Sequence, residues 1–216
     1  MNKVQYIPPY LPPYRETKDT FIQVHGEGMV KAEPDVVIVT LGVITDDISV
    51  QTAQERNATT SKSLLSALKQ IGIEESDIAT LSYTITPLYK VDNTLQGYRV
   101  EHLYEITVVN VQKAGGVYAV AMEAGANITH GLTFRVSNPN TFINKALTIA
   151  VANALEKASV IANALRVTIH PVPISIKEER GTSFAVYGAS QILSAPSIQP
   201  GEITITARVI ANFTYT

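Results

Sequence analysis

The chain has 216 residues, of which 45% are hydrophobic and 17% charged, and its net charge is −2. This length can bury a sizeable core in one large domain or two small ones, and the low charged fraction leaves apolar area for a subunit interface. The near-neutral charge without basic or acidic runs argues against nucleic acid or an anionic membrane as partner, and the absence of cysteine excludes disulfides, thiolate catalysis and cysteine-ligated metals.

The first 20 residues are rich in proline and tyrosine. Proline fixes the backbone and removes a hydrogen-bond donor, so this segment is predicted to be an extended, polyproline-like tail. Packing on its own domain or on a neighbouring subunit is favoured over binding of Pro9-x-x-Pro12 to an aromatic groove. The start lacks the apolar core of a signal peptide, and no run reaches the length of a transmembrane helix. The chain as written is therefore expected to be cytoplasmic, or periplasmic if it is a mature form.

Two apolar segments follow at 21–31 and 35–46, separated by Glu33-Pro34-Asp35, and this pattern predicts a hairpin. The nearly continuous apolar run of 36–43 predicts a central strand that is covered on both faces. A helix should come next, with Asp47 or Ser49 as its cap and Gly72 after its end. Its apolar stripe has a polar gap, because it consists of Val50, Ala53, Leu64, Leu68 and Ile71 with Asn57 and Ser61 between them.

Residues 80–91 and 96–110 are predicted strands joined at Asp92-Asn93 in a second, longer hairpin. From 103 onward the pattern is strand, helix (113–124), strand (127–137), helix. Asn138-Pro139 is a strong start signal for the last helix, which can run to Leu165 over roughly 40 Å. This helix has too many apolar residues for one narrow stripe, so one face should cover a sheet and another should meet a partner.

Residues 166–179 return to strand, and 181–202 read as a long irregular loop, a kind of segment that is usually functional, ordered by a partner, or disordered. The chain closes with an alternating strand over 203–215. Its predicted inward face consists of Ile203, Ile205, Ala207, Val209, Ala211 and Phe213.

Residues with catalytic or metal-binding potential are scattered. His25 and Glu27 lie on one face of a predicted strand, where a surface pair is favoured over a two-ligand metal site. Gly26 and Gly28 between and beside them indicate a bend or close backbone approach rather than a phosphate loop, and Gly115-Gly116 indicates close backbone packing. The acidic clusters at 46–47 and 74–77 flank a helix, where carboxylates are stabilising or solvated. We therefore predict no catalytic, cofactor-binding or metal-binding residues.

Short motifs along 21–215 resemble, in order, those of a known family. They are Val24-His-Gly-Glu-Gly-Met-Val30, Glu33-Pro-Asp-Val36, Leu41-Gly-Val43, Ala53-Gln-Glu-Arg-Asn57, Gly72-Ile73, Asp77-Ile78, Tyr83-Thr-Ile-Thr-Pro-Leu-Tyr89, Gly97-Tyr98, Gly125-Ala-Asn127, Gly131-Leu-Thr-Phe134, Glu156-Lys-Ala158 and Pro200-Gly-Glu-Ile203. Each motif alone is weak, but together they resemble the SIMPL domain family, a family without an agreed activity that includes a bacterial periplasmic immunogenic protein and relatives linked to oxidative stress.

The resemblance implies an α+β fold. A β-rich outer domain built from both chain ends, with a long helix packed on its sheet, should hold an inserted β-α-β-α subdomain. We assign 1–20 to the tail, 21–102 and 166–216 to the outer domain, and 103–165 to the inserted subdomain. Ring- or channel-like oligomers are implied as well. The long helix departs from the family over 151–162, where relatives carry more charge, so its interface need not be theirs.

Three functions remain open at this stage. The first is a non-enzymatic, homo-oligomeric protein associated with stress or the cell envelope. The second is a module that binds a peptide or small ligand through the 182–200 loop and the N-terminal tail. The third and least favoured is a hydrolase or metal enzyme that uses His25, Glu27 or His102. The preferred prediction is a protein that is not an enzyme, uses no cofactor and has itself as partner.

Overall fold

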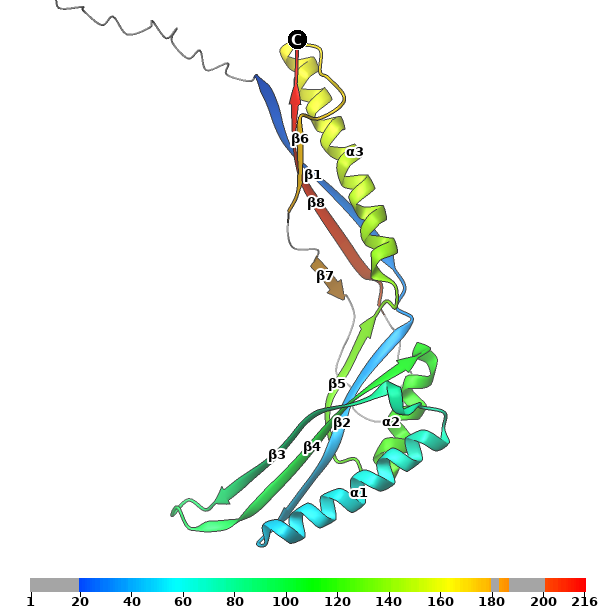
Figure 1. Cartoon of the computed structure of the whole chain (residues 1–216), viewed down its shortest axis with the longest axis vertical. Coiled ribbons are helices and arrows are strands. Elements are labelled where there is room, and N and C mark those ends of the chain that lie inside the picture. Colours follow the sequence, from blue (N-terminus) through cyan, green and yellow to red (C-terminus); the bar gives the residue numbers. More distant parts are fainter. Residues whose placement is uncertain (1–19, 180–182, 187–200) are drawn as a thin grey trace, which may run out of the picture.

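The computed structural model describes residues 20–179, 183–186 and 201–216. The described chain is elongated, and two layers of helix on sheet follow one another along its long axis (Figure 1). Both sheets are built from antiparallel pairs. The predicted α+β class, with a long helix packed on a sheet, is confirmed.

One layer joins the two ends of the chain. Strand β1 (Phe21–Ala32) pairs along its whole length with β8 (Ile203–Thr214), and the short strands β6 (Ser175–Glu178) and β7 (Ser183–Val186) pair with β8 as well. The predicted inward face of β8 is confirmed, because its six alternating apolar residues are all buried. The predicted loop of 181–202 contains β7, and the rest of it lies outside the described residues apart from 201–202.

Helix α3 (Pro139–Leu165) covers this sheet through a row of alanines. The buried residues of the helix recur at every fourth position: Ala146, Ala150, Ala154, Ala158 and Ala162. Opposite them, a Cβ added at Gly26 would collide with the carbonyl oxygen of Ala150, and one at Gly28 would collide with that of Ala146. The prediction that these glycines mark a close backbone approach is therefore confirmed.

The second layer is a four-stranded sheet in the order β3-β4-β2-β5. Its strands are β2 (Val36–Asp47), β3 (Ile78–Tyr89), β4 (Leu95–Val109) and β5 (Ile128–Arg135). Helices α1 (Val50–Gln70) and α2 (Ala114–Glu123) cover one face of it, with single 3₁₀ turns at Glu75–Asp77 and Val111–Lys113. The prediction of a central, buried strand at 36–43 is confirmed in β2.

Local signals explain where these helices begin and end. The Ser49 hydroxyl accepts a hydrogen bond from the backbone N–H of Thr52 at the start of α1, which satisfies a donor that has no partner within the helix. Gly72 and Gly125, after α1 and α2, have the positive φ angles that glycine tolerates best. At α3, Asn138 occupies the capping position without a side-chain hydrogen bond, and Arg166 takes the left-handed conformation after the last turn.

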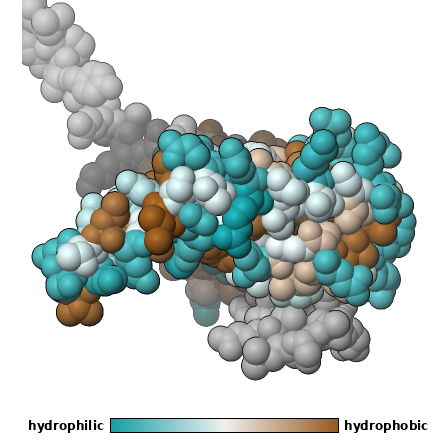
Figure 2. Space-filling view, turned by 90° about the horizontal axis from the view of Figure 1, so that it is seen from below, coloured by the Kyte–Doolittle hydropathy of each residue, from teal (hydrophilic) through white to brown (hydrophobic). Residues whose placement is uncertain are grey.

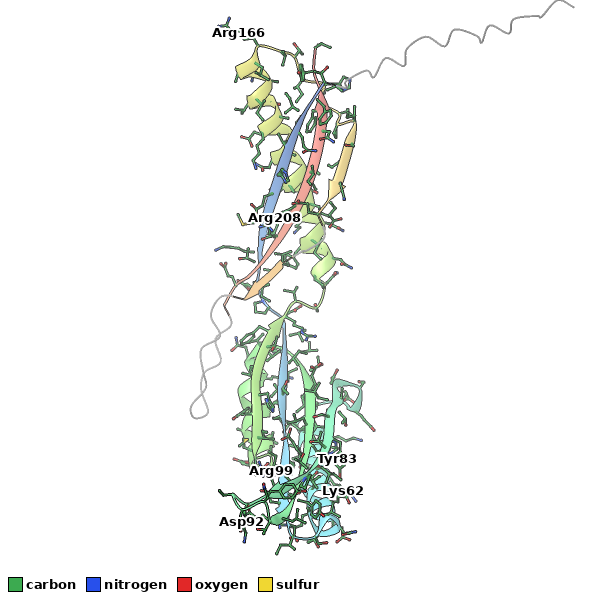
Figure 3. The ribbon with its side chains drawn as sticks, turned by 90° about the vertical axis from the view of Figure 1, so that its left-hand side faces the viewer. Lys62, Tyr83, Asp92, Arg99, Arg166 and Arg208 are labelled. Carbon is green, nitrogen blue, oxygen red and sulfur yellow. The ribbon has the colours of Figure 1, made fainter. Side chains whose placement is uncertain are left out.

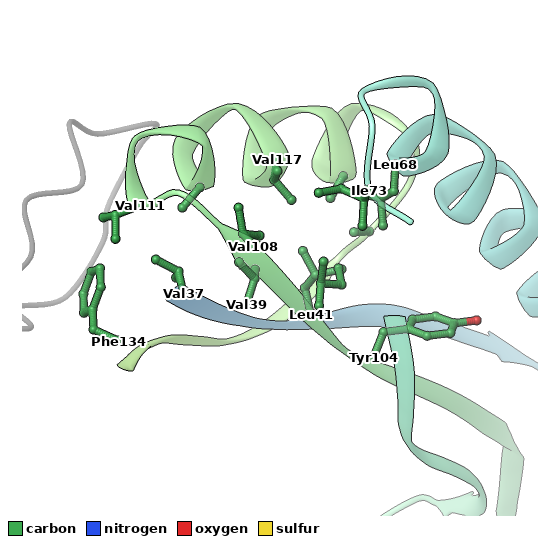
Figure 4. Close-up of a cluster of buried hydrophobic side chains, with 14 of the residues drawn as sticks. Val37, Val39, Leu41, Leu68, Ile73, Tyr104, Val108, Val111, Val117 and Phe134 are labelled. Carbon is green, nitrogen blue, oxygen red and sulfur yellow. The ribbon is translucent and has the colours of Figure 1, made fainter. Parts of the chain in front are cut away.

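The main core lies between the second sheet and its two helices (Figure 4). Alternate residues of β2, namely Val37, Val39, Leu41 and Val43, are almost fully buried against Leu64 and Leu68 of α1. Ile203 and Ile205 of β8 also belong to this core, so the two layers share buried side chains where they meet.

The prediction of a hairpin at Glu33-Pro34-Asp35 is wrong. Strand β1 pairs with β8, whereas β2 pairs with β4 and β5, so the chain passes from one sheet to the other at this point. Asp35 fastens the crossing, because its carboxylate accepts hydrogen bonds from the backbone N–H (2.7 Å) and the hydroxyl (2.5 Å) of Ser137. Ser137 precedes α3, so this contact joins the two chain segments that cross between the layers.

The two sheets also group the chain differently from the boundaries expected at 102/103 and 165/166. Strand β4 runs continuously from 95 to 109, and α3 packs on β1 and β8 rather than on β4 or β5. Strand register and the alanine row of α3 determine which elements pack together. Neither can be predicted from the order of elements along the chain.

Candidate functional site

A groove with a volume of about 580 Å³ runs beside α1. Its wall is one face of the helix, since Lys62, Leu65 and Lys69 follow one another at spacings of three and four residues. Its floor is formed by β3 and β4, which contribute Tyr83 and His102. Figure 3 shows Lys62 and Tyr83 at the same level of the molecule. We call this feature the α1 groove.

A buried polar network lies under the groove. Asn57 is fully buried, and its side-chain amide donates to the carbonyl oxygens of Val43 (2.9 Å) and Val100 (3.2 Å). The Ser61 hydroxyl donates to Asn57 Oδ1 at 3.3 Å. Because these bonds join α1 to β2 and β4, the network fixes the helix on the sheet and gives buried polar atoms the partners they need.

The network continues to the surface through Tyr104 and His102. The Tyr104 hydroxyl lies 2.9 Å from His102 Nδ1, Ser61 Oγ lies 3.5 Å from the same atom, and Thr80 Oγ1 lies 3.4 Å from His102 Nε2. Burial lowers the pKa of His102, so the neutral imidazole is favoured. Burial also raises the pKa of Tyr104, which keeps its hydroxyl proton.

Aromatic contacts complete the floor of the groove. The rings of Tyr83 and His102 meet edge to face with centroids 5.0 Å apart, and His102 is tilted against Tyr104 at 4.2 Å. Tyr83 is nevertheless 46% exposed. The groove therefore offers a ligand an aromatic surface, hydroxyl groups and an imidazole, with ammonium groups on the opposite wall.

Ser61 and His102 could be taken for a nucleophile and its base. Ser61 is only 4% exposed, and its proton is committed to Asn57. A substrate carbonyl cannot approach a hydroxyl in that position, so the contacts suit a structural network better than acyl transfer.

The structure gives the other two candidates of the sequence different partners. His25 Nδ1 lies 3.7 Å from Glu179 Oε1, whereas Glu27 accepts a hydrogen bond from Arg208 at 2.8 Å. Each therefore has a surface partner of its own, on strand β8 or just after β6. Across the described ranges, histidine, aspartate and glutamate do not gather in groups of three that could hold a metal ion.

The acidic pair at 46–47 is tied to arginines. Both carboxylate oxygens of Asp46 accept from Arg99, at 2.9 and 2.7 Å, and this bond lowers the pKa of Asp46. Asp47 lies 3.5 Å from Arg56.

For the glycine pair Gly115-Gly116, the prediction of close backbone packing is wrong at Gly116, because a Cβ there would meet open space.

Apolar side chains are concentrated on the β3–β4 hairpin. Between Leu81 and Leu95, those at least 40% exposed, apart from Tyr83 in the groove, are Leu81, Ile85, Tyr89, Val91 and Leu95. We call these five residues the hairpin patch. Figure 2 shows hydrophobic side chains on the left of the view, where this hairpin projects. Single exposed apolar residues are ordinary, but a group on a projecting element is typical of an interaction surface.

The two longest terminal strands differ in how their edges are protected. In the described sheets β1 and β3 are terminal strands of 12 residues, whereas the terminal strands β5, β6 and β7 are shorter. Two side chains of α3 cover the edge of β1: the backbone N–H of Glu27 donates to Asn153, and Lys157 donates to the carbonyl oxygen of His25. Strand β3 instead carries a bulge near Leu81 and a proline at position 87, which protect its edge at those two points.

The sequence missed the groove, although it contained one signal. Asn57 and Ser61 interrupt the apolar stripe of α1, and the structure shows that they are the buried base of the network. The pairing of Tyr83 with His102 depends on strand register and could not be seen. The ligand-binding segments that we predicted, 182–200 and the tail, lie outside the described residues except for 183–186 and the last residue of the tail. Of the described helices, none has the length and apolarity to cross a bilayer.

Comparisons with known proteins agree on one family. A family model described as SIMPL, protein of unknown function (DUF541), matches residues 22–213. The chain is 31% identical to the 26 kDa periplasmic immunogenic protein of Brucella melitensis over 156 residues, which cover 68% of this chain and 62% of that protein. It is 25% identical to the uncharacterized protein YggE of Escherichia coli K12 over 150 residues, or 68% and 61% of the two chains. The matches thus span less than two thirds of these relatives.

Proposed function

Because this chain belongs to the SIMPL family, for which no function is established, we propose that it is a non-enzymatic subunit that assembles with copies of itself through the β3–β4 hairpin. The family predicted from the sequence motifs is confirmed by the match over residues 22–213. The observation that carries the proposal is the hairpin patch, five exposed apolar residues on a projecting element.

The strand edges support the hairpin as the contact. A second copy can extend a sheet only where backbone N–H and C=O groups are accessible. On β1, Asn153 and Lys157 already occupy two of these groups. Strand β3 pairs with β4 alone in the described sheet, and its apolar side chains would be buried by a neighbouring copy. Both the hydrogen bonds and the burial of apolar area would then stabilise the assembly.

Replacing Val91 and Leu95 by aspartate tests the proposal. Both side chains are at least half exposed, so the fold should tolerate the change, while two carboxylates in a buried contact would oppose assembly. Light scattering should show a multiple of 23.4 kDa for the native chain and the single-chain mass for V91D/L95D. The matched control is Val172→Asp, at an exposed valine beyond the end of α3, which should keep the native mass. An unchanged mass in V91D/L95D would exclude this interface.

The location and the physiological role rest on the family alone. The name of the Brucella relative describes that protein as periplasmic and immunogenic. As part of the proposal, this chain is located in the cell envelope as well. Fractionation of the native organism with an antibody against the chain tests it. An association with oxidative stress stays a prediction from the resemblance.

A further inference from the structure

Two lysines line the α1 groove at different distances along the helix from His102. Lys62 and Lys69 are seven residues apart, which separates them by roughly 10 Å along the helix. Lys69 lies in the last turn of α1, and it lines the groove together with Glu75 of the following 3₁₀ turn. Lys62 follows Ser61, whose hydroxyl oxygen lies 3.5 Å from His102 Nδ1, and neither lysine forms an ion pair with another described residue. Lys62 is therefore the groove cation at the His102 end of the helix.

The two ring nitrogens of His102 face different neighbours. Asn57 uses its amide hydrogens on two carbonyl oxygens, so its Oδ1 accepts and Ser61 donates to it. The Tyr104 hydroxyl lies 2.9 Å from His102 Nδ1 inside the network. If Tyr104 donates this hydrogen bond, a neutral imidazole carries its proton on Nε2. Nε2 lies 3.4 Å from the hydroxyl oxygen of Thr80, a long contact that a ligand oxygen can replace.

We propose that the α1 groove binds a small organic anion that consists of one carboxylate on a flat apolar body. The ammonium group of Lys62, the Nε2–H of His102 and the hydroxyl of Thr80 would bind the carboxylate. The body would lie along Leu65 toward Ile73 and Ile78, with one edge on Tyr83. One cation and two neutral donors suit a single negative charge, and a doubly charged phosphate would call for more cations. The volume of the groove is within the range of small-molecule sites.

Titration of the full-length protein with 1-naphthoate tests this site, with 1-naphthamide as the neutral probe of nearly the same shape. Binding is followed by calorimetry and by the ¹⁵N signals of His102. The naphthoate should bind at least tenfold more tightly than the amide, because hydrogen bonds to a charged group are stronger than those to a neutral group. The proton of His102 should be found on Nε2, and its signal should move on addition of naphthoate.

Two charge-neutralising variants on the same helix face provide the matched comparison. Lys62→Gln should weaken naphthoate binding about tenfold or more, whereas Lys69→Gln should change it less than twofold. Equal binding of acid and amide, equal losses in both variants, or no binding at millimolar concentration would each overturn the proposal. The V91D/L95D variant should bind naphthoate as the native chain does, so a failed assembly proposal and a failed ligand site give different results.

Discussion

The contact between β1 and α3 makes Gly26 the position where one methyl group should cost most. In Gly26→Ala, the new Cβ would collide with the backbone carbonyl oxygen of Ala150 and lie 2.8 Å from Ala154 Cβ. A backbone oxygen cannot rotate away, so α3 would have to move outward and loosen the whole alanine row. Overpacking costs about 1–3 kcal/mol, and a collision with backbone belongs at the upper end. The lower entropy of the unfolded alanine variant returns about 0.4–1 kcal/mol.

The net expectation for Gly26→Ala is a loss of about 2–3 kcal/mol, or roughly 4–12 °C in Tm for a chain of this length. Urea unfolding followed by circular dichroism at one fixed protein concentration measures it. Gly116→Ala is the control, because it places the same methyl group inside α2 with nothing within 4 Å, and it should stabilise by about 0.5–1 kcal/mol. If both variants changed stability by the same amount, the close approach of β1 and α3 would be refuted.

Three further changes probe the network and the crossing between the layers. Asn57→Ala removes the donor to two carbonyl oxygens and should cost about 2–4 kcal/mol in the same urea assay; a loss below 1 kcal/mol would contradict the network. Hydrogen bonds from Ser137 lower the pKa of Asp35, so its contribution is present above about pH 3.8 and lost as the pH falls through the lowered pKa. The stability gap between the native chain and Asp35→Asn should therefore close in acid, and a constant gap would argue against the contact. Burial lowers the pKa of His102, so the folded state binds fewer protons than the unfolded state just below pH 6.5. As the pH is lowered through that range, the stability of the native chain should fall, and that of His102→Gln should fall less. Thermal melts at pH 7.5 and 5.5 measure the difference.

Local signals predicted most of the elements. The Ser49 cap, Gly72 and the Asn138-Pro139 start have short-range causes, and the structure places helix boundaries at or next to each of them. Alternation along 203–213 predicted the buried face of β8 for the same reason. The glycines of β1 signalled a close approach, although the sequence could not say that helix α3 is what approaches.

The pairing of strands that are distant in the sequence could not be predicted. Pro34 between two apolar runs resembles a turn, but which strands pair depends on register with partners more than 50 residues away along the sequence. The α1 groove depends on the same register, because Tyr83 meets His102 across β3 and β4. Asn57 could be recognised in the sequence as a polar residue in an apolar stripe. Its two carbonyl partners could not be predicted, because they belong to β2 and β4.

The mass of the native protein in solution tests the central claim most directly. Sedimentation velocity or light scattering over a range of micromolar concentrations should give an assembly that is a multiple of 23.4 kDa and that dissociates in V91D/L95D. A native chain that stays at 23.4 kDa at every concentration would contradict the proposal that this protein works as a self-assembling subunit.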